Sequence, residues 1–246
     1  MKNILEVKNL NVYYTDKGSL FHGKKEEKHA LKNVSFIMRE GEILGLVGES
    51  GCGKTSLAKA LLGMQKKYDG EIRLDCANPQ MVFQDPYGSL NPAKRIGWIL
   101  EEPLRMKHAY SAEERRQKVD EMLDKVGIDR KCREHYPNEL SGGQRQRVAI
   151  AQALLCDTKF LIADEPVSAL DVTIQAQIIR LLLKLHQEMG ISILFISHDL
   201  RVVYQMCDRV MIMRSGEILE QGDIDEIYNH PQTDYTKLLL EAANII

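Results

Sequence analysis

A glycine-rich segment that follows an apolar run constrains the fold of this chain most strongly. Gly48-Glu-Ser-Gly-Cys-Gly-Lys54-Thr55 matches the pattern GxxxxGK[ST], and Glu42–Val47 before it is almost continuously apolar. Such a run is typical of a strand buried on both faces of a parallel sheet, and Lys54–Leu62 is predicted to be helical. The glycines let the loop backbone turn its N–H groups inward, where they and the helix N-terminus bind phosphate. The segment therefore predicts a nucleotide-binding α/β protein.

We expect different residues of this loop to contact different parts of the bound nucleotide. Lys54 would reach the β- and γ-phosphates, and the Thr55 hydroxyl would bind Mg²⁺. The full set predicted to contact the nucleotide here is Gly48, Glu49, Ser50, Gly51, Cys52, Gly53, Lys54, Thr55 and Ser56.

A second apolar run is followed directly by two acidic residues. Phe160–Ala163 ends abruptly in Asp164 and Glu165, which places both carboxylates at the carboxyl edge of a parallel sheet, where ligands bind. We expect Asp164 to hold Mg²⁺ through water and Glu165 to polarise the attacking water.

Composition narrows the function mainly by exclusion. The 246 residues carry 33 Lys and Arg against 35 Asp and Glu, a net charge of −2 that fits neither a basic nucleic-acid coat nor a disordered acidic tail. The five cysteines have no metal-ligand spacing, and we expect them to be reduced. No apolar run approaches the ~20 residues that span a bilayer, and the N-terminal segment is unlike a signal peptide. Any contact with a membrane is expected to go through a partner.

The order of the patterns predicts how the chain is organised. Ile4–Tyr14 and Ala30–Arg39 alternate like antiparallel strands around a polar loop, and the role of its Lys-rich part, residues 17–28, is left open. Residues from Asn91 to about Tyr136 are helical and charged, as in a helical insertion. The helix Val172–Met189 lies between two β-type runs, Phe160–Ala163 and Ser192–Ile196, in a βαβ rhythm. A hairpin around Ser215-Gly216 and a helix over Asp234–Ala243 follow.

The segment Leu140–Gln144 starts a helix in an unusual way. Ser141 and Gln144 fit a capping box, S-x-x-Q, which alone would indicate a well-capped helix and nothing more. Two glycines follow the cap, although glycine is a poor helix former. The second interpretation is that these glycines leave backbone amides bare for a phosphate.

Taken together, these motifs resemble the ATP-binding cassette of ABC transporters, whose signature motif is LSGGQ. The resemblance implies that Gln84 in MVFQDP contacts Mg²⁺ and the attacking water, and that His198 in ISHD lies near the γ-phosphate. It also implies that Tyr14 stacks on adenine, with Tyr13 as a close rival. The residues assigned to the nucleotide of a facing subunit are Ser141, Gly142, Gly143, Gln144 and, in the segment SALD, Asp171. The implied catalytic residues are Glu165, His198 and Gln84.

The resemblance covers nearly the whole chain and sets the expected fold. It implies an α/β fold of the P-loop NTPase class, with a mixed β core, an N-terminal antiparallel β subdomain and an inserted helical subdomain. Within a single ATPase domain over 1–246, the core would comprise 1–90 and 157–246, and the helical signature subdomain 91–156. ATP and Mg²⁺ are the implied cofactors.

The sequence segments around the motifs are similar to those of the peptide/nickel group of ABC importers. These segments are VFQDPYGSLNP, ELSGGQRQRVAIAQAL and SALDVTIQAQI. The end at Ile246, without the Cys-containing extension of many peptide importers, slightly favours nickel or metallophore uptake. The same outline also fits accessory ATPases of phosphonate C–P lyase.

The resemblance also implies partners. A second cassette, more often a different one than a copy, would close face to face with this one around two ATP molecules. Two membrane subunits would dock a short helix in a groove near Asp85–Glu102, with Trp98 either lining that groove or buried. An extracytoplasmic solute-binding protein would act indirectly, nucleic acid would not be a partner, and the chain would lie at the cytoplasmic face of the membrane. The sequence leaves the solute open.

Overall fold

The computed structural model describes residues 2–15, 27–65, 67–168 and 170–245. The polar loop predicted between the first two strands, including most of the Lys-rich part at 17–28, lies outside these residues. The chain forms two compact units, Met1–Asp75 with Leu194–Ile246, and Cys76–Ile193. The predicted division of one ATPase domain into a core, 1–90 with 157–246, and a helical signature subdomain, 91–156, stays a prediction.

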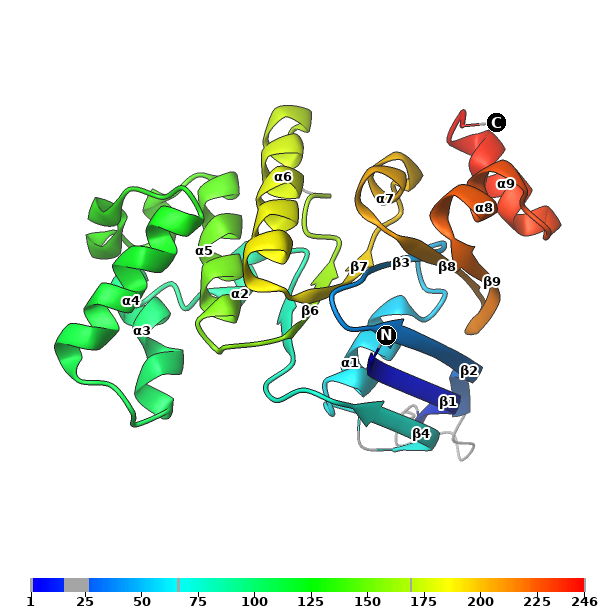
Figure 1. Cartoon of the computed structure of the whole chain (residues 1–246), viewed down its shortest axis with the longest axis horizontal. Helices are drawn as coiled ribbons and strands as arrows, with labels where there is room; N and C mark the ends of the chain where they lie inside the picture. The colour runs from blue at the N-terminus through cyan, green and yellow to red at the C-terminus, as the bar shows by residue number, and fades with distance from the viewer. Residues whose placement is uncertain (1, 16–26, 66, 169, 246) are drawn as a thin grey trace, which may run out of the picture. The chain divides into compact units, whose positions relative to one another are not determined.

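The first unit begins with an antiparallel sheet of order β2-β1-β4 (Figure 1). Its strands are β1 (Asn3–Thr15), β2 (Glu27–Arg39) and β4 (Tyr68–Leu74). Alternating apolar residues make the first two strands, and Val12 pairs with Leu31 in the register while both are fully buried. The sequence patterns did not predict β4, because its residues are mostly exposed and carry no apolar alternation.

The rest of the first unit surrounds a second group of strands. β3 (Ile43–Val47) is buried throughout and pairs in parallel with β8 (Arg209–Arg214), which pairs antiparallel with β9 (Glu217–Asp223). The predicted hairpin around Ser215-Gly216 is confirmed. The helices are α1 (Lys54–Leu61), α7 (Leu200–Met206), α8 (Ile224–Asn229) and α9 (Asp234–Ala242).

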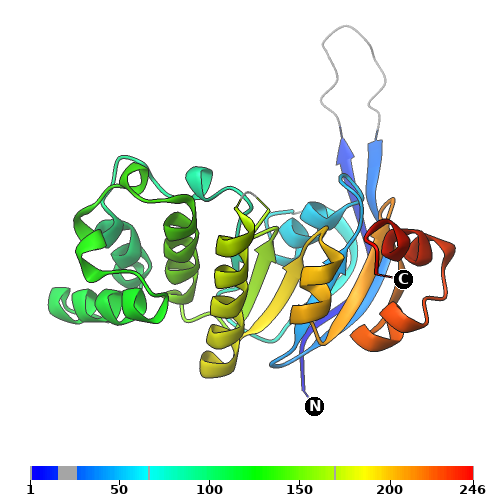
Figure 2. The ribbon, with the colours of Figure 1, turned by 90° about the horizontal axis from the view of Figure 1, so that it is seen from above.

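The second unit holds a parallel strand pair and the predicted helical region. β5 (Gln80–Val82) pairs in parallel with β6 (Phe160–Asp164), and β7 (Ser192–Ile196) begins in this unit and ends in the first. The helices are α2 (Pro86–Ser89), α3 (Ile96–Met106), α4 (Ala112–Lys125), α5 (Gly142–Leu154) and α6 (Val172–Met189), with 3₁₀ turns at Arg130–Glu134 and Pro137–Glu139. α3, α4 and α5, drawn in green, form one cluster (Figure 2).

Local sequence explains where several of these helices begin and end. Ser111 caps α4 in a capping box with Glu114, and the hydrogen bonds from Ser111 lower the pKa of the Glu114 carboxyl. α6 has the predicted bounds, and it ends at Gly190, whose left-handed conformation (φ 61°) suits glycine. Across the described residues, no helix combines the length and the apolar character that spanning a bilayer requires.

Candidate nucleotide-binding site

The first unit builds the phosphate loop between β3 and α1. Gly51 and Gly53 have positive φ values of 80° and 120°, a conformation that glycine adopts without steric cost. The Lys54 side chain is buried, with only 7% of the residue exposed, and its ammonium group donates to the carbonyl oxygens of Gly48 (2.7 Å) and Glu49 (3.0 Å). The predicted strand–loop–helix geometry is therefore present, with the lysine folded inside the loop.

The loop is held tightly by its surroundings in the same unit. A Cβ added at Gly48 would collide with the carbonyl oxygen of Met213, so the close approach to β8 requires glycine. The Cys52 carbonyl accepts a hydrogen bond from Gly216 N (2.8 Å) in the β8–β9 turn. Burial raises the pKa of the Cys52 thiol, against the attraction of the Lys54 ammonium, which indicates a packed and inert thiol.

Thr55, Ser56 and His198 are further predicted site residues in the first unit. Thr55 is exposed at the start of α1, and Ser56 beside it is half-buried. His198 is exposed in the turn between β7 and α7, where Ser197 N donates to the Leu46 carbonyl (3.2 Å) and so joins the ends of β7 and β3. The predicted histidine and the phosphate loop thus follow two strands whose carboxyl ends meet.

Tyr13 and Tyr14 follow one another on β1 and therefore point to opposite faces of the strand. Tyr13 stacks on His29, its cross-strand partner, with ring centroids 4.3 Å apart, and His29 also contacts the Asn11 side chain. Tyr14 lies opposite Lys28 in the register and is half-buried. The ring of Tyr13 thus already has a stacking partner on one face.

The second unit carries the predicted acids. Asp164 ends β6 and is half-buried, and Glu165 follows it with φ at +47°, a left-handed conformation that costs a non-glycine residue roughly 1–3 kcal/mol. The Glu165 carbonyl accepts from Ser168 N (3.3 Å) and Ser168 Oγ (3.2 Å), which closes the turn. Glu165 is thus held directly after β6 in a conformation that glycine adopts more easily.

Gln84 lies at the same sheet edge within this unit. Val82 of β5 is paired with Ala163 of β6, and Gln84 and Glu165 each lie two residues beyond that pair. Gln84 is exposed. The parallel pairing thus explains how a glutamine and a glutamate 81 residues apart in sequence come to the same edge (165 − 84).

The signature segment forms the predicted helix start. Ser141 caps α5 by accepting from Gln144 N (3.3 Å), and the Gln144 side chain accepts from Ser141 N (2.9 Å), so the capping box is confirmed. Close packing also requires glycine at position 143, which the sequence analysis missed. A Cβ there would lie 2.5 Å from Ile174 Cγ2 of α6, while one at Gly142 would make an ordinary contact of 3.4 Å with Leu170.

Asp171 begins α6. Its carboxylate accepts a hydrogen bond from Ile174 N (3.0 Å), as an N-cap residue does, and the residue is exposed. Ala169 of the same SALD segment lies outside the described residues. Asp171 and Gly143 are thus linked through Ile174 in the first turn of α6, since Ile174 N donates to Asp171 and the Ile174 side chain packs against Gly143.

The predicted binding of Mg²⁺ is compatible with the oxygen atoms that the predicted residues carry. Mg²⁺ that arrives with a nucleotide is usually held by phosphate oxygens, waters and one or two protein oxygens. The exposed Thr55 hydroxyl, the Asp164 carboxylate and the Gln84 amide oxygen have this chemistry. Among the described residues no cluster of three or more His, Cys, Asp or Glu could hold a metal on its own. All five cysteines lie in the described residues, and none of them forms a disulfide.

A cavity of about 570 Å³ lies near the predicted docking groove in the second unit. Its lining includes Phe83, Ser89, Glu102, Pro103, Met106 and Ala149. Phe83 and Met106 are large apolar side chains with much of their surface exposed. Trp98 is not in the lining. It is half-buried instead, with the Lys94 ammonium 4.8 Å and the Arg105 guanidinium 4.9 Å from its ring.

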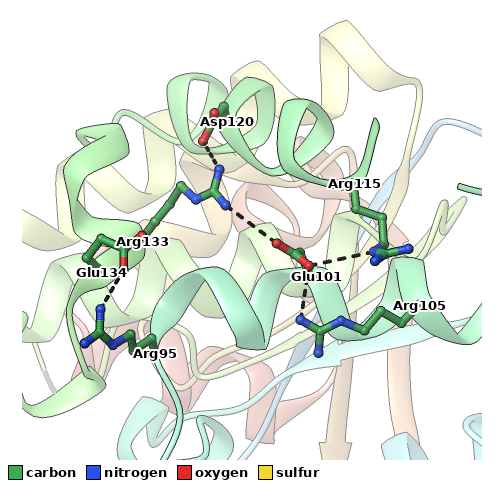
Figure 3. A network of polar contacts seen from close by, with 7 residues as sticks. All are labelled: Arg95, Glu101, Arg105, Arg115, Asp120, Arg133 and Glu134. Carbon is green, nitrogen blue, oxygen red and sulfur yellow. Dashed lines mark hydrogen bonds and ion pairs between the residues drawn. The ribbon is translucent and has the colours of Figure 1, made fainter. Parts of the chain in front are cut away.

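A polar network that sequence analysis missed anchors the helix beside this cavity. Glu101 of α3 forms ion pairs with Arg105 (3.1 Å), Arg115 (3.7 Å) and Arg133 (3.6 Å), and Arg133 also pairs with Asp120 (2.9 Å), as Figure 3 shows. These arginines come from α3, α4 and the 3₁₀ turn at Arg130–Glu134. The network therefore fixes α3, whose Glu102, Pro103 and Met106 line the cavity.

Comparison with known proteins decides the family. Residues 31–168, more than half of the chain, match the family described as "ABC transporter". The chain belongs to the ABC transporter family. It is 46% identical over 260 residues to the oligopeptide transport ATP-binding protein OppF of Haemophilus influenzae, and 44% identical over 255 residues to the dipeptide transport ATP-binding protein DppF of the same organism. Each alignment covers 98% of this chain and 78% of the relative.

A solved structure confirms the fold of this ABC cassette. The dimeric, post-hydrolysis structure of the ATP-binding cassette MJ0796 with ADP and Pi has a TM-score of 0.75 and 30% identity, and covers 89% of this chain and 98% of that one. The predicted α/β cassette fold, with one antiparallel and one largely parallel sheet, is therefore confirmed. So is the assignment of the protein as an ABC ATPase.

Proposed function

We propose that this ABC ATPase drives the import of dipeptides or oligopeptides. The observation that carries the proposal is a phosphate loop and an LSGGQ helix start in a chain that is 44–46% identical, over almost its whole length, to a dipeptide and an oligopeptide transport ATP-binding protein. ATP supplies the free energy, and the chain's own residues bind it, orient it and activate water.

Each predicted residue has a role in hydrolysis that its position supports. The Lys54 ammonium exchanges the Gly48 and Glu49 carbonyls for the β- and γ-phosphates of ATP, and Tyr14 stacks on adenine because Tyr13 is engaged with His29. Glu165 accepts a proton from the attacking water, and Gln84 and His198 orient that water and the γ-phosphate. Thr55, Gln84 and, through water, Asp164 would hold Mg²⁺, which would offset charge on the phosphates.

The signature helix start is proposed to serve a facing cassette. One nucleotide needs one phosphate loop, and a second amide-rich helix start in the same chain is redundant unless it binds another subunit's ATP. Ser141 and Gly143 would contact that γ-phosphate, and Asp171 would act across the interface. The relative MJ0796 forms a dimer, which supports this arrangement. We propose a heterodimer of two different cassettes.

The cavity beside α3 is proposed to receive a short helix from a membrane subunit. Its exposed Phe83 and Met106 fit an apolar helix face, and Gln84, the proposed sensor of the γ-phosphate, directly follows Phe83. Nucleotide state and docking are thereby linked through adjacent residues. In this arrangement the cassette lies at the cytoplasmic face of the membrane, bound to two membrane subunits, while a solute-binding protein acts on the other side.

A gentle detergent pull-down of the tagged chain, with mass spectrometry of the bound proteins, tests this assembly. We expect a second ABC cassette and two polytopic membrane proteins. Recovery of soluble phosphonate-processing subunits without a membrane protein would overturn the transport function and leave the ATPase intact.

The cargo is tested with the purified complex in liposomes. We expect a di- or oligopeptide, presented with the accompanying solute-binding protein, to stimulate ATP hydrolysis and to accumulate with MgATP on the cassette side. Stimulation by nickel chelates or metallophores, and not by peptides, would contradict the peptide proposal while supporting an importer.

A further inference from the structure

Two neighbouring glutamates on α3 have different surroundings. Glu101 is half-buried and forms ion pairs with three arginines, one of them on its own helix (Figure 3). Glu102 is exposed and lines the cavity beside α3, and its carboxylate forms no hydrogen bond or ion pair with any described residue. Successive helix positions are about 100° apart, which lets one glutamate meet the arginines while the next lines the cavity. Glu101 is therefore neutralised within the fold, whereas Glu102 is left for a group outside it.

Lys107 is the other charged side chain in the described lining of the cavity, and its charge is already used. Its ammonium group donates to the Leu155 carbonyl (3.1 Å) and forms an ion pair with the Asp157 carboxylate. Leu155 is the C-cap of α5, where a cation also interacts favourably with the helix dipole. The charge that the cavity leaves unpaired is therefore the negative charge of Glu102.

The surface around Glu102 is apolar and held in place by the fold. Phe83 and Met106 line the cavity with much of their surface exposed, and Met106 follows Glu102 by four residues on α3, so the two share one side of the helix. Glu101 ties α3 to α4 and to the following 3₁₀ turn, while Lys107 ties the end of α3 to the end of α5. A surface that is ordered beforehand loses little entropy on binding, so its charge pattern can discriminate between partners.

We propose that Glu102 selects the partner of this cavity by pairing with a Lys or Arg side chain on the docked helix of the membrane subunit. The inference rests on the proposed function, in which that helix occupies the cavity, and it adds the chemistry of the helix: an apolar face with a basic residue beside it. Docking removes water from Glu102, and a carboxylate left without a partner would oppose binding. A cation at the matching position offsets that cost, and a helix with an acidic residue there is repelled.

Detergent pull-down of the tagged full chain at several salt concentrations tests the charge at position 102. We expect Glu102→Gln to reduce recovery of the membrane subunits roughly fivefold, as for the loss of one partly exposed ion pair, and Glu102→Lys to reduce it at least tenfold through repulsion. Recovery by the original chain should fall as salt rises, whereas recovery by Glu102→Gln should depend on salt less. Glu121→Lys is the matched control, because Glu121 is an exposed glutamate of α4 outside the cavity lining.

Melting temperatures of the isolated variants separate docking from general damage. Glu102→Gln should melt within a few degrees of the original chain, because its carboxylate has no contact to lose among the described residues. Glu101→Gln should melt clearly lower, since it leaves the arginines around it without their carboxylate. If Glu102→Lys does not fold, Glu102→Gln and its salt dependence decide the question.

The docked segment itself is identified by cross-linking in the complex, with Met106 replaced by a photoreactive amino acid. Mass spectrometry of the product should show a helical segment of a membrane subunit that contains Lys or Arg. Each basic residue of that segment is then changed to Glu, and one such change should restore recovery by Glu102→Lys to at least half of the original level. This charge reversal assigns the partner of Glu102 to one residue.

The outcomes distinguish the pairing from the proposed function beneath it. If Glu102→Gln and Glu102→Lys recover the membrane subunits as well as Glu121→Lys does, the pairing is overturned and docking at the cavity stands. A cross-linked segment that lacks Lys and Arg, or that comes from a second copy of this chain or from a soluble protein, overturns the pairing as well. An original chain that recovers no membrane protein overturns the proposed function itself.

Discussion

At the scale of single residues, Glu165 combines a sheet-edge position with a left-handed backbone that favours glycine. A turn that tolerates this cost places the carboxylate where the strand ends, which fits a base that acts on water. We predict that Glu165→Gln retains MgATP affinity within a few-fold and lowers steady-state hydrolysis at least 100-fold. Equilibrium titration and phosphate release measure the two quantities. Turnover above a tenth of the original rate would remove Glu165 from the role of base.

Gly143 gives a second prediction at this scale. An added methyl group would lie 2.5 Å from Ile174 Cγ2, so Gly143→Ala should destabilise the chain by about 1–3 kcal/mol through overpacking. Denaturant unfolding measures the change. In an Ile174→Ala background the same substitution should cost clearly less, because the clashing methyl is gone. Gly142→Ala is the control, with its nearest contact at an ordinary 3.4 Å. A cost that is unchanged in the Ile174→Ala background would contradict the steric explanation.

At the scale of elements, the docking of α9 should depend on pH. Burial alone would raise the pKa of Glu220, but the hydrogen bonds from Thr236, Gln232 and Thr233 outweigh it and hold the pKa below its usual range. The folded state therefore prefers the carboxylate. Its contribution to stability is complete above the unfolded-state pKa of about 4.3 and is lost as pH falls through the lower folded-state value.

Denaturant midpoints between pH 7 and pH 3 check this dependence. Glu220→Gln should be less stable at pH 7, because an amide brings its own donors to a site that already consists of donors, and it should lose less stability than the original chain below pH 4.5. Glu217→Gln, an exposed position on the same strand, should follow the original profile. Parallel profiles for Glu220→Gln and the original chain would contradict the assignment.

Sequence patterns predicted those helices and strands whose own residues show the apolar pattern and the end signals of the element. α6, with its apolar face and Gly190, and β7, buried throughout, have the predicted bounds. β4 was missed because its exposed residues pair with β1 through backbone hydrogen bonds, which leave no apolar pattern. The site was predicted as separate motifs. The packing of Ile174 against Gly143 was not predicted, because it joins residues that are distant in sequence and of ordinary type.

At the scale of the whole molecule, nucleotide chemistry and membrane docking must be coupled yet separable by mutation. Phe83 lines the cavity beside α3 and Gln84 follows it, while Glu101 ties α3 to Arg115 of α4 and Arg133 of the following 3₁₀ turn. A variant on α3 that does not touch nucleotide residues should therefore uncouple docking from ATP binding. Met106 suits this purpose, because it lines the cavity with 76% of its surface exposed.

We predict that Met106→Glu leaves the MgATP affinity of the isolated chain within twofold and reduces recovery of membrane subunits in the detergent pull-down at least fivefold. The reason is that a docked helix would have to bury the new carboxylate against apolar surface without a partner, which costs several kcal/mol. Leu238→Glu, an exposed apolar residue on α9, is the matched control and should recover the membrane subunits normally. If Met106→Glu recovers them as well as the control does, the docking surface lies elsewhere on the cassette. If it instead abolishes nucleotide binding, α3 belongs to the nucleotide site, and docking and ATP binding are not separable at α3.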